Sequence, residues 1–153
     1  MKLNRAVLSL MTVILLCSSL AVSKTSSYLP NSQPSDVQYM SAEELKTKLT
    51  KSQPVTIIDV RATESYADSN RKIRGAIHLK LRRLKYRLAF EPLNKVSHES
   101  EVVTYCACPN DELSIQAAQM LQESGFKRAR VLKGGWNAWL KLNGPVESIA
   151  KGM

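Results

Sequence analysis

The chain has 153 residues, enough for one domain with a substantial core and too few for two ordinary domains. Hydrophobic residues make up 44% of it and charged residues 23%, a balance that excludes a disordered chain and a protein with several membrane spans. The formal charge at pH 7 is +9, so the composition favours anionic partners.

Residues 1–23 have the pattern of a secretory signal peptide. Lys2 and Arg5 give a basic start, residues 6–22 are almost wholly apolar or small, and Ala21-Val22-Ser23 offers a small-x-small cleavage site. We therefore expect an exported protein, periplasmic or extracellular. The alternative is an uncleaved segment that anchors the protein in a membrane, because the apolar run approaches the length of a span.

Removal of residues 1–23 would leave 20 basic and 13 acidic side chains, a formal charge of +7. Export argues against nucleic acid as a partner of this basic chain, and it leaves anionic small molecules, acidic proteins and anionic lipid. The same cleavage would remove Cys17, so that Cys106 and Cys108 remain as a single Cys-Ala-Cys site.

The next segment, residues 24–36, mixes Ser, Pro and Asn without apolar periodicity and is predicted to be a linker. An ordered domain is expected over residues 37–146, with residues 147–153 as a short polar tail. No internal repeat is evident.

Within this domain, predicted strands alternate with predicted helices. Ser41-Ala42-Glu43-Glu44 has the form of a capping box and predicts a helix to about Thr50, and the β-branched residues 55–60 predict a strand buried on both sides. The remaining expected elements are a helix at 62–67, a strand at 76–79, a helical segment at 81–89, a strand at 101–105, a helix at 112–124, a strand at 129–132 and a helix at 136–142. This alternation predicts an α/β fold with a small central parallel sheet and helices on both faces.

Cys106 directly follows the strand predicted at 101–105 and precedes a helix that begins near Asp111 or Glu112. Ligands of parallel sheets bind beyond the carboxyl ends of the strands, where amide groups and helix N-termini favour an anion such as a thiolate or persulfide. Taken alone, such a cysteine is equally compatible with a buried residue at a strand end.

Five segments resemble, in the right order, the motifs of the rhodanese-like domain family. They are the opening helix at Ser41–Leu45, an Asp-x-Arg strand end at Ile58–Arg61, the segment Ile73–Ile77, the catalytic strand at Val102–Cys106, and a Gly-Gly-x-x-x-Trp motif within Lys133–Trp139. The resemblance covers residues 37–146 and implies the rhodanese-like fold.

The resemblance implies a sulfurtransferase in which Cys106 takes sulfur from thiosulfate or a thiol persulfide and passes it to a thiophilic acceptor, and the pattern of residues 1–23 predicts that it is exported. It assigns the active loop, which binds the substrate, to Ala107, Cys108, Pro109, Asn110, Asp111 and Glu112. Asp59 and Arg61 correspond to a structural pair that supports the loops near the site. No cofactor is implied, and a monomer is expected.

The active loop departs from the family pattern Cys-x-x-Gly-x-Arg. Asp111 stands where the arginine is expected, and Pro109 removes one amide donor. Carboxylates at Asp111 and Glu112 suit the start of a helix, and this ordinary helix role is the simpler interpretation. They would also repel a dianion, so thiosulfate is expected to be a poor donor and a thiol persulfide the alternative.

Other functions remain open at this point. Cys108 lies close enough to resolve a persulfide as a labile disulfide, which would make the protein a thiol redox protein, and a non-catalytic rhodanese-like binding module is a further alternative. Phosphatase chemistry is disfavoured because Glu112 occupies the position of the required arginine. His78 and His98 give the cysteines no zinc-ligand spacing, so no metal is expected.

The densest charge run lies between Arg71 and Phe90, which contains no Asp or Glu. Its cations are Arg71, Lys72, Arg74, Lys80, Arg82, Arg83, Lys85 and Arg87. We expect either a solvated face or a surface that steers an anionic donor or docks an acidic protein partner.

Overall fold

The computed structural model describes residues 37–149, and the expected signal peptide and linker lie outside them. The strands are β1 (Gln38–Met40), β2 (Thr56–Asp59), β3 (Arg71–Ile73), β4 (Ile77–His78), β5 (Glu101–Tyr105), β6 (Arg128–Leu132) and β7 (Val146–Ser148). The α-helices are α1 (Ala42–Thr50), α2 (Thr63–Ser69), α3 (Leu84–Arg87), α4 (Glu112–Glu123) and α5 (Gly135–Lys141), and the 3-10 helices are η1 (Leu81–Arg83) and η2 (Leu93–Lys95).

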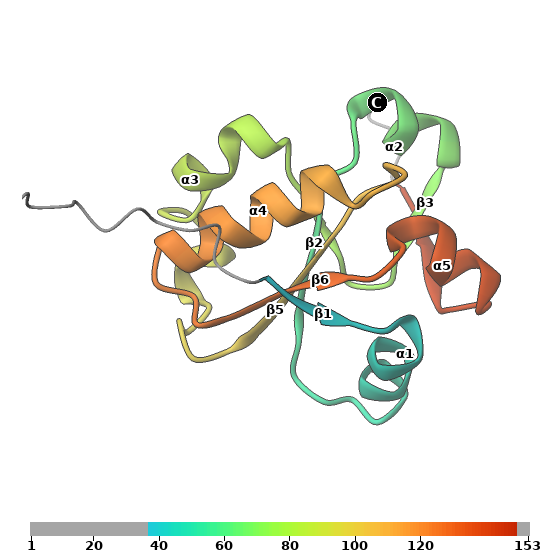
Figure 1. Ribbon diagram of the computed structural model, residues 1–153, viewed down its shortest axis with the longest axis horizontal. Helices are drawn as coiled ribbons and strands as arrows, with labels where there is room; N and C mark the ends of the chain where they lie inside the picture. Colours follow the sequence, from blue (N-terminus) through green and yellow to red (C-terminus); the bar gives the residue numbers. More distant parts are fainter. Residues whose placement is uncertain (1–36, 150–153) are drawn as a thin grey trace, which may run out of the picture. The chain divides into compact units, whose positions relative to one another are not determined.

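A five-stranded parallel sheet in the order β1-β6-β5-β2-β4 forms the centre of the fold (Figure 1). Helices flank this sheet, so the predicted α/β class and the parallel sheet are confirmed. A separate antiparallel pair joins β3 to β7. This pair was not predicted from the sequence. Through β7, the pair places Glu147 and Ser148 of the expected tail in a strand.

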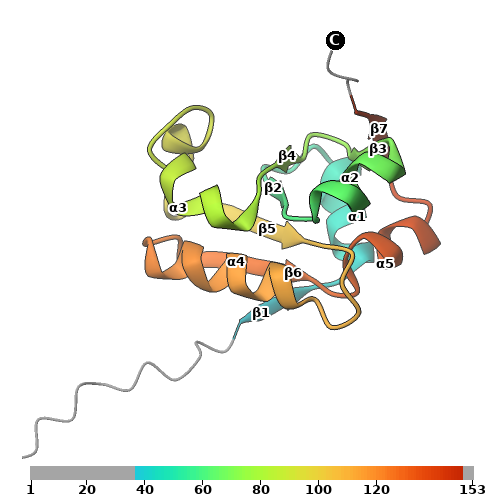
Figure 2. The same ribbon diagram turned by 90° about the horizontal axis from the view of Figure 1, so that it is seen from above.

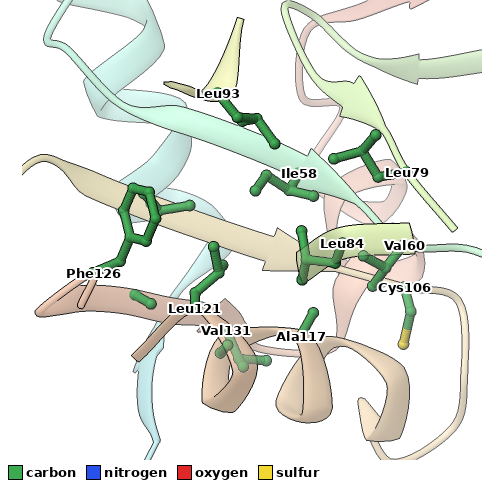
Figure 3. Close-up of a cluster of buried hydrophobic side chains, with 13 residues drawn as sticks. Ile58, Val60, Leu79, Leu84, Leu93, Cys106, Ala117, Leu121, Phe126 and Val131 are labelled. Atoms are coloured by element: carbon green, nitrogen blue, oxygen red, sulfur yellow. The ribbon is translucent and has the colours of Figure 1, made fainter. Parts of the chain in front are cut away.

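Successive residues of the central strands point to opposite faces of the sheet, as the two-residue period of a strand requires. Val102 of β5 belongs to the buried cluster on the α4 side, and Val103 belongs to the cluster beneath α1 and α5. Figure 3 shows the first cluster, in which Leu84 of α3 and Leu121 of α4 pack over the strands and Cys106 lies at the rim.

The first helix has the Ser41 cap that its sequence predicts, but the Glu44 carboxylate, which would complete a capping box by reaching back to Ser41, pairs with Arg130. The Ser41 hydroxyl accepts a hydrogen bond from the Glu44 amide at 3.1 Å, and α1 begins at the next residue, Ala42. Leu45 of α1 is fully buried, which fixes the helix against the sheet. By contrast, the segment predicted to be helical over 81–89 divides into η1 and the short α3.

Three strand ends meet at the carboxyl edge of the sheet (Figure 2). The register pairs Asp59 of β2 with both His78 of β4 and Tyr105 of β5. Because the strands are parallel, the residues that follow them lie at the same edge, and Cys106 is the first residue after β5.

Within residues 37–149, no helix is both long and apolar enough to cross a membrane.

Candidate active site

Cys106 lies at the end of β5 with no exposed surface. Its carbonyl oxygen accepts a hydrogen bond from the Trp136 amide at 2.8 Å, which ties the start of the active loop to the first turn of α5. The sulfur of Cys106 is therefore shielded from solvent in this structure.

The structure pairs Cys106 with Cys108 in a disulfide, with the two Cα atoms 5.7 Å apart. Cys108 is half-buried whereas Cys106 is fully buried, so an attacking thiol would meet Cys108 first. In this oxidised form Cys106 carries no thiolate, and any chemistry at its sulfur must follow reduction.

Two groups direct hydrogens toward the Cys106 sulfur: the Cys108 amide at 3.4 Å and the Ser114 hydroxyl at 3.5 Å. The Ser114 hydroxyl also lies 2.8 Å from the Asp111 carbonyl oxygen, which accepts a second hydrogen bond from the Ile115 amide at 2.8 Å. Because Ile115 keeps that carbonyl satisfied, the single Ser114 hydrogen can turn to a thiolate on Cys106. Ser114 is fully buried and was not among the residues predicted from the sequence.

Asp111 turns inward, which differs from the ordinary helix acid expected at this position. It has a left-handed backbone, φ 55°, and its side chain does not cap α4. Instead its Oδ2 accepts a hydrogen bond from the Gly134 amide at 2.9 Å. Its Oδ1 is buried and has no hydrogen-bond partner within the described residues. Asp111 therefore clamps the active loop to the Gly134-Gly135 turn.

The backbone approaches closely at Gly135, whose φ is +48°. A Cβ atom there would lie 2.2 Å from the Cys106 carbonyl oxygen and 3.3 Å from Asp111 Oδ1. The Gly-Gly motif is thus explained by the contact between the α5 turn and the active loop.

The remaining loop residues lie toward the surface. Pro109, Asn110 and Glu112 are exposed and Ala107 is half-buried, so the loop presents its polar groups outward and buries the sulfur of Cys106. Of the two predicted loop carboxylates, Glu112 is the one that faces solvent.

Asp59 and Arg61 form a fully buried ion pair at the end of β2. The Arg61 Nε donates to both carboxylate oxygens at 3.0 Å, and its Nη2 donates to Asp59 Oδ2 at 2.6 Å. The guanidinium also donates to Ser69 Oγ at 2.8 Å and to the Arg71 carbonyl at 2.9 Å. One side chain therefore joins β2 to the end of α2 and the start of β3.

Aromatic rings surround this guanidinium. The guanidinium carbon of Arg61, Cζ, lies 4.3 Å from the ring centroid of Trp136, 5.2 Å from that of Tyr66 and 5.6 Å from that of Tyr105. Such contacts favour a cation that has been removed from water. They connect the pair to α5, whose Trp136 amide in turn holds Cys106.

The same network shifts two pKa values. Burial opposes ionisation of Asp59, but the contacts of His78, Arg61 and Tyr105 and the charge of Arg61 outweigh it and lower the pKa of this carboxyl. Burial raises the pKa of the Tyr105 phenol, and the neighbouring Asp59 carboxylate raises it further. The phenol stays protonated and donates to Asp59 Oδ2 at 2.7 Å.

His78 lies beside this network, a position that the residues around it in the sequence did not predict. Its ring stacks on Tyr66 with the centroids 3.7 Å apart, and its Nδ1 lies 3.9 Å from Asp59 Oδ1. That distance is too long for a hydrogen bond, so His78 packs against the pair.

A surface pocket of about 580 Å³ is lined by Lys48, Thr56, Glu101 and Arg128, with Gln53, Pro54, Val55 and Ser100. These residues lie around the amino ends of β2 and β5, whereas Cys106 follows the carboxyl end of β5. In the part of the chain that the structure describes, no group of three or more His, Cys, Asp or Glu residues is arranged to hold a metal ion.

The fold and the site together define an α/β thiol protein with its cysteine held by a loop at the carboxyl edge of a parallel sheet. The profile of the Rhodanese-like domain family matches residues 41–142. The chain therefore belongs to the rhodanese-like domain family.

Solved structures with the same fold include the Alr3790 protein from Anabaena, which is 31% identical with a TM-score of 0.62 over 72% of this chain and 82% of that one. The human single-domain sulfurtransferase TSTD1 is 26% identical, with a TM-score of 0.58 over 69% of this chain and 96% of that one. The protein RPA3614 from Rhodopseudomonas palustris, described as a possible tyrosine phosphatase, is 22% identical with a TM-score of 0.63 over 72% and 85% of the two chains, and it shares the fold alone. A comparison with curated proteins gave no match.

Replacement of Arg61 by Met should lower the free energy of unfolding by about 3–5 kcal/mol at pH 7, because it leaves the Asp59 carboxylate buried without its partner. The pKa of Asp59 is lower in the folded protein than its ordinary value of 3.8. Ionised Asp59 therefore stabilises the fold fully when the pH is above 3.8, and this stabilisation is lost as the pH falls through the pKa of the folded state. The deficit of the variant should therefore shrink in acid. Urea unfolding at several pH values measures it.

Lys85→Met is the matched control for Arg61→Met, because it removes a cation from an exposed pair with Glu123. We expect an effect below about 1 kcal/mol. Equal losses in the two variants would contradict the importance of the buried pair.

Replacement of Gly135 by Ala should destabilise the protein and displace the active loop, since the new methyl group would overlap the Cys106 carbonyl oxygen. Gly75→Ala is the control: its φ is +77°, but nothing lies within 4 Å of the added carbon, so it adds backbone strain of about 1 kcal/mol without a clash. Thermal unfolding measures both, and similar losses would contradict a close contact at Gly135.

Replacement of Ser114 by Ala should raise the pKa of the reduced Cys106 thiol by about one unit, because a charged sulfur loses one hydrogen-bond donor. The midpoint of the alkylation rate against pH, followed on the Cys106 peptide in a Cys108→Ser background, gives this pKa. Ser114→Thr keeps the hydroxyl and should restore the midpoint, whereas an unchanged midpoint in Ser114→Ala would show that the hydroxyl does not reach the thiolate.

Proposed function

We propose that this protein is a sulfurtransferase in which Cys106 carries the transferable sulfur as a persulfide. The observation that carries the proposal is the placement of Cys106 after β5, with the Cys108 amide and the Ser114 hydroxyl directed at its sulfur. Membership of the rhodanese-like family and the likeness to a human sulfurtransferase support the same chemistry.

The reaction begins once a thiol has reduced the Cys106–Cys108 disulfide. The Cys106 thiolate attacks the outer sulfur of the donor, the donor's S–S bond breaks, and the donor leaves as a thiolate, or as sulfite where the donor is thiosulfate. An acceptor thiolate then attacks the outer sulfur on Cys106. The bond to Cys106 breaks, the acceptor leaves as a persulfide, and the Cys106 thiolate is restored.

Charge near the sulfur favours a thiol persulfide over thiosulfate as the donor. Asp111 is almost fully buried beside the loop, and its Oδ1 has no hydrogen-bond partner among residues 37–149 to offset its charge. A dianion entering this site meets that carboxylate and the exposed Glu112. A thiol persulfide brings less charge, so it suffers less repulsion.

The disulfide favours a second candidate function for the same cysteines. After Cys106 has taken up a sulfur, the Cys108 thiolate can attack the inner sulfur, which belongs to Cys106, and release hydrosulfide. The Cys106–Cys108 disulfide forms in that step, and two external thiols must reduce it before the next cycle. In this scheme the protein releases sulfide instead of passing a persulfide on.

We propose that the protein acts outside the cytoplasm, as the pattern of residues 1–23 predicts, with a small sulfur donor and a thiol acceptor as its partners.

The test is the intact mass of the reduced protein after incubation with thiosulfate and, separately, with a small-molecule persulfide. Wild type and Cys108→Ser should gain one cyanide-labile sulfur, more readily from the persulfide because of the acidic loop. Cys106→Ser should gain none, because it lacks the acceptor sulfur. If Cys106→Ser still gains a cyanide-labile sulfur, Cys106 is excluded as the carrier.

The same samples separate the other candidates. Hydrosulfide release by wild type, with a stable persulfide on Cys108→Ser, would establish the resolving role of Cys108. Absence of any adduct on a folded, reduced protein would leave a non-catalytic binding module.

A further inference from the structure

The segment from Lys80 to Phe90 presents a basic and aromatic surface that the sulfur chemistry does not use. We call it the α3 surface, and it consists of the exposed residues Lys80, Arg82, Arg83, Lys85, Tyr86 and Phe90. Lys85 pairs with Glu123 at 2.9 Å. Within residues 37–149, Lys80, Arg82 and Arg83 have no ion-pair partner, so their charges are available to an external anion.

Two aromatic rings stand among these cations. Tyr86 is 67% exposed and Phe90 is 42% exposed, and their ring centroids lie 4.7 Å apart. Tyr39 is the one other exposed large hydrophobic residue in the described part of the chain. The two rings form a small exposed apolar site within the segment that carries Lys80, Arg82, Arg83 and Lys85.

The inner side of the same segment is fixed in the core. Leu84 has no exposed surface and belongs to the buried cluster that includes Cys106 (Figure 3). Leu81 and Leu88 pack against that cluster. Because these leucines hold the segment in place, the backbone that carries the cations and rings has a fixed position on the domain. The α3 surface is therefore part of the folded domain and not a loose loop.

We propose that the α3 surface docks the domain on an anionic lipid membrane. Lys and Arg side chains meet the lipid phosphates, while exposed aromatic rings enter the boundary between headgroups and acyl chains. An acidic protein partner could use the same cations and rings, and the test below includes that outcome. The apolar residues 6–22 give a separate reason to place this chain at a membrane, as an export signal or as an anchor.

The test is binding of the purified full-length chain to sedimented vesicles of phosphatidylcholine, with and without one quarter phosphatidylglycerol. Wild type should bind the anionic vesicles about tenfold more tightly at ~0.1 M salt and lose this preference at ~0.5 M salt, because salt screens the contacts. Lys2 and Arg5 also favour anionic lipid, but they are present in every variant, so the contribution of the α3 surface is the difference between the variants.

Arg82→Glu/Arg83→Glu should reduce the preference for anionic lipid by about fivefold or more, and Tyr86→Ser/Phe90→Ser should weaken binding to the same vesicles. Lys51→Glu/Lys141→Glu is the matched control, since both residues are exposed and the change in charge is the same. It should stay within about twofold of wild type. Circular dichroism checks that all variants are folded.

An equal loss in the control would show that only the net charge of the protein acts. Absence of any preference for anionic lipid in wild type would overturn the proposal and leave an acidic protein as the partner of this surface.

Discussion

The buried ion pair between Asp59 and Arg61 organises the edge of the sheet on which the site is built. Its guanidinium holds the end of α2, the first residue of β3 and the ring of Trp136, and its carboxylate holds the Tyr105 hydroxyl. Neither charge has access to water, so removal of one partner leaves the other unsatisfied at a cost of several kcal/mol. The pair therefore holds β2, α2, β3, β5 and α5 together. Cys106 directly follows Tyr105 of β5, so its position is fixed as well.

The active loop, which follows β5, is held by the start of α5. Trp136 donates its amide to the Cys106 carbonyl, and Asp111 accepts the amide of Gly134, so both ends of the loop are attached to the start of α5. The sulfur is thereby buried, whereas the sulfur transfer that we propose requires a donor and an acceptor to reach it. The disulfide with the more accessible Cys108 couples access to redox state, because its reduction removes one of the links that close the loop.

The sequence predicted the features that depend on local pattern. The alternation of elements, the cap at Ser41 and the place of Cys106 after a buried strand all follow from periodicity and spacing. The antiparallel pair of β3 and β7 was missed because it joins three-residue segments more than seventy positions apart. The inward turn of Asp111 and the approach of Ser114 to the sulfur were missed for a related reason: each depends on how the loop folds back in three dimensions.

The position of Asp111 gives the unusual loop a physical meaning. The resemblance to the family implies an arginine here, a side chain suited to binding an anion. In this chain a carboxylate stands in that place, and it accepts the hydrogen bond of the Gly134 amide. The protein's own carboxylate thus takes the place of an anion at this amide. In the sulfur transfer that we propose, the donor is then recognised less by its charge than by its reactive sulfur, beside the Cys108 amide and the Ser114 hydroxyl, and this favours a thiol persulfide over thiosulfate.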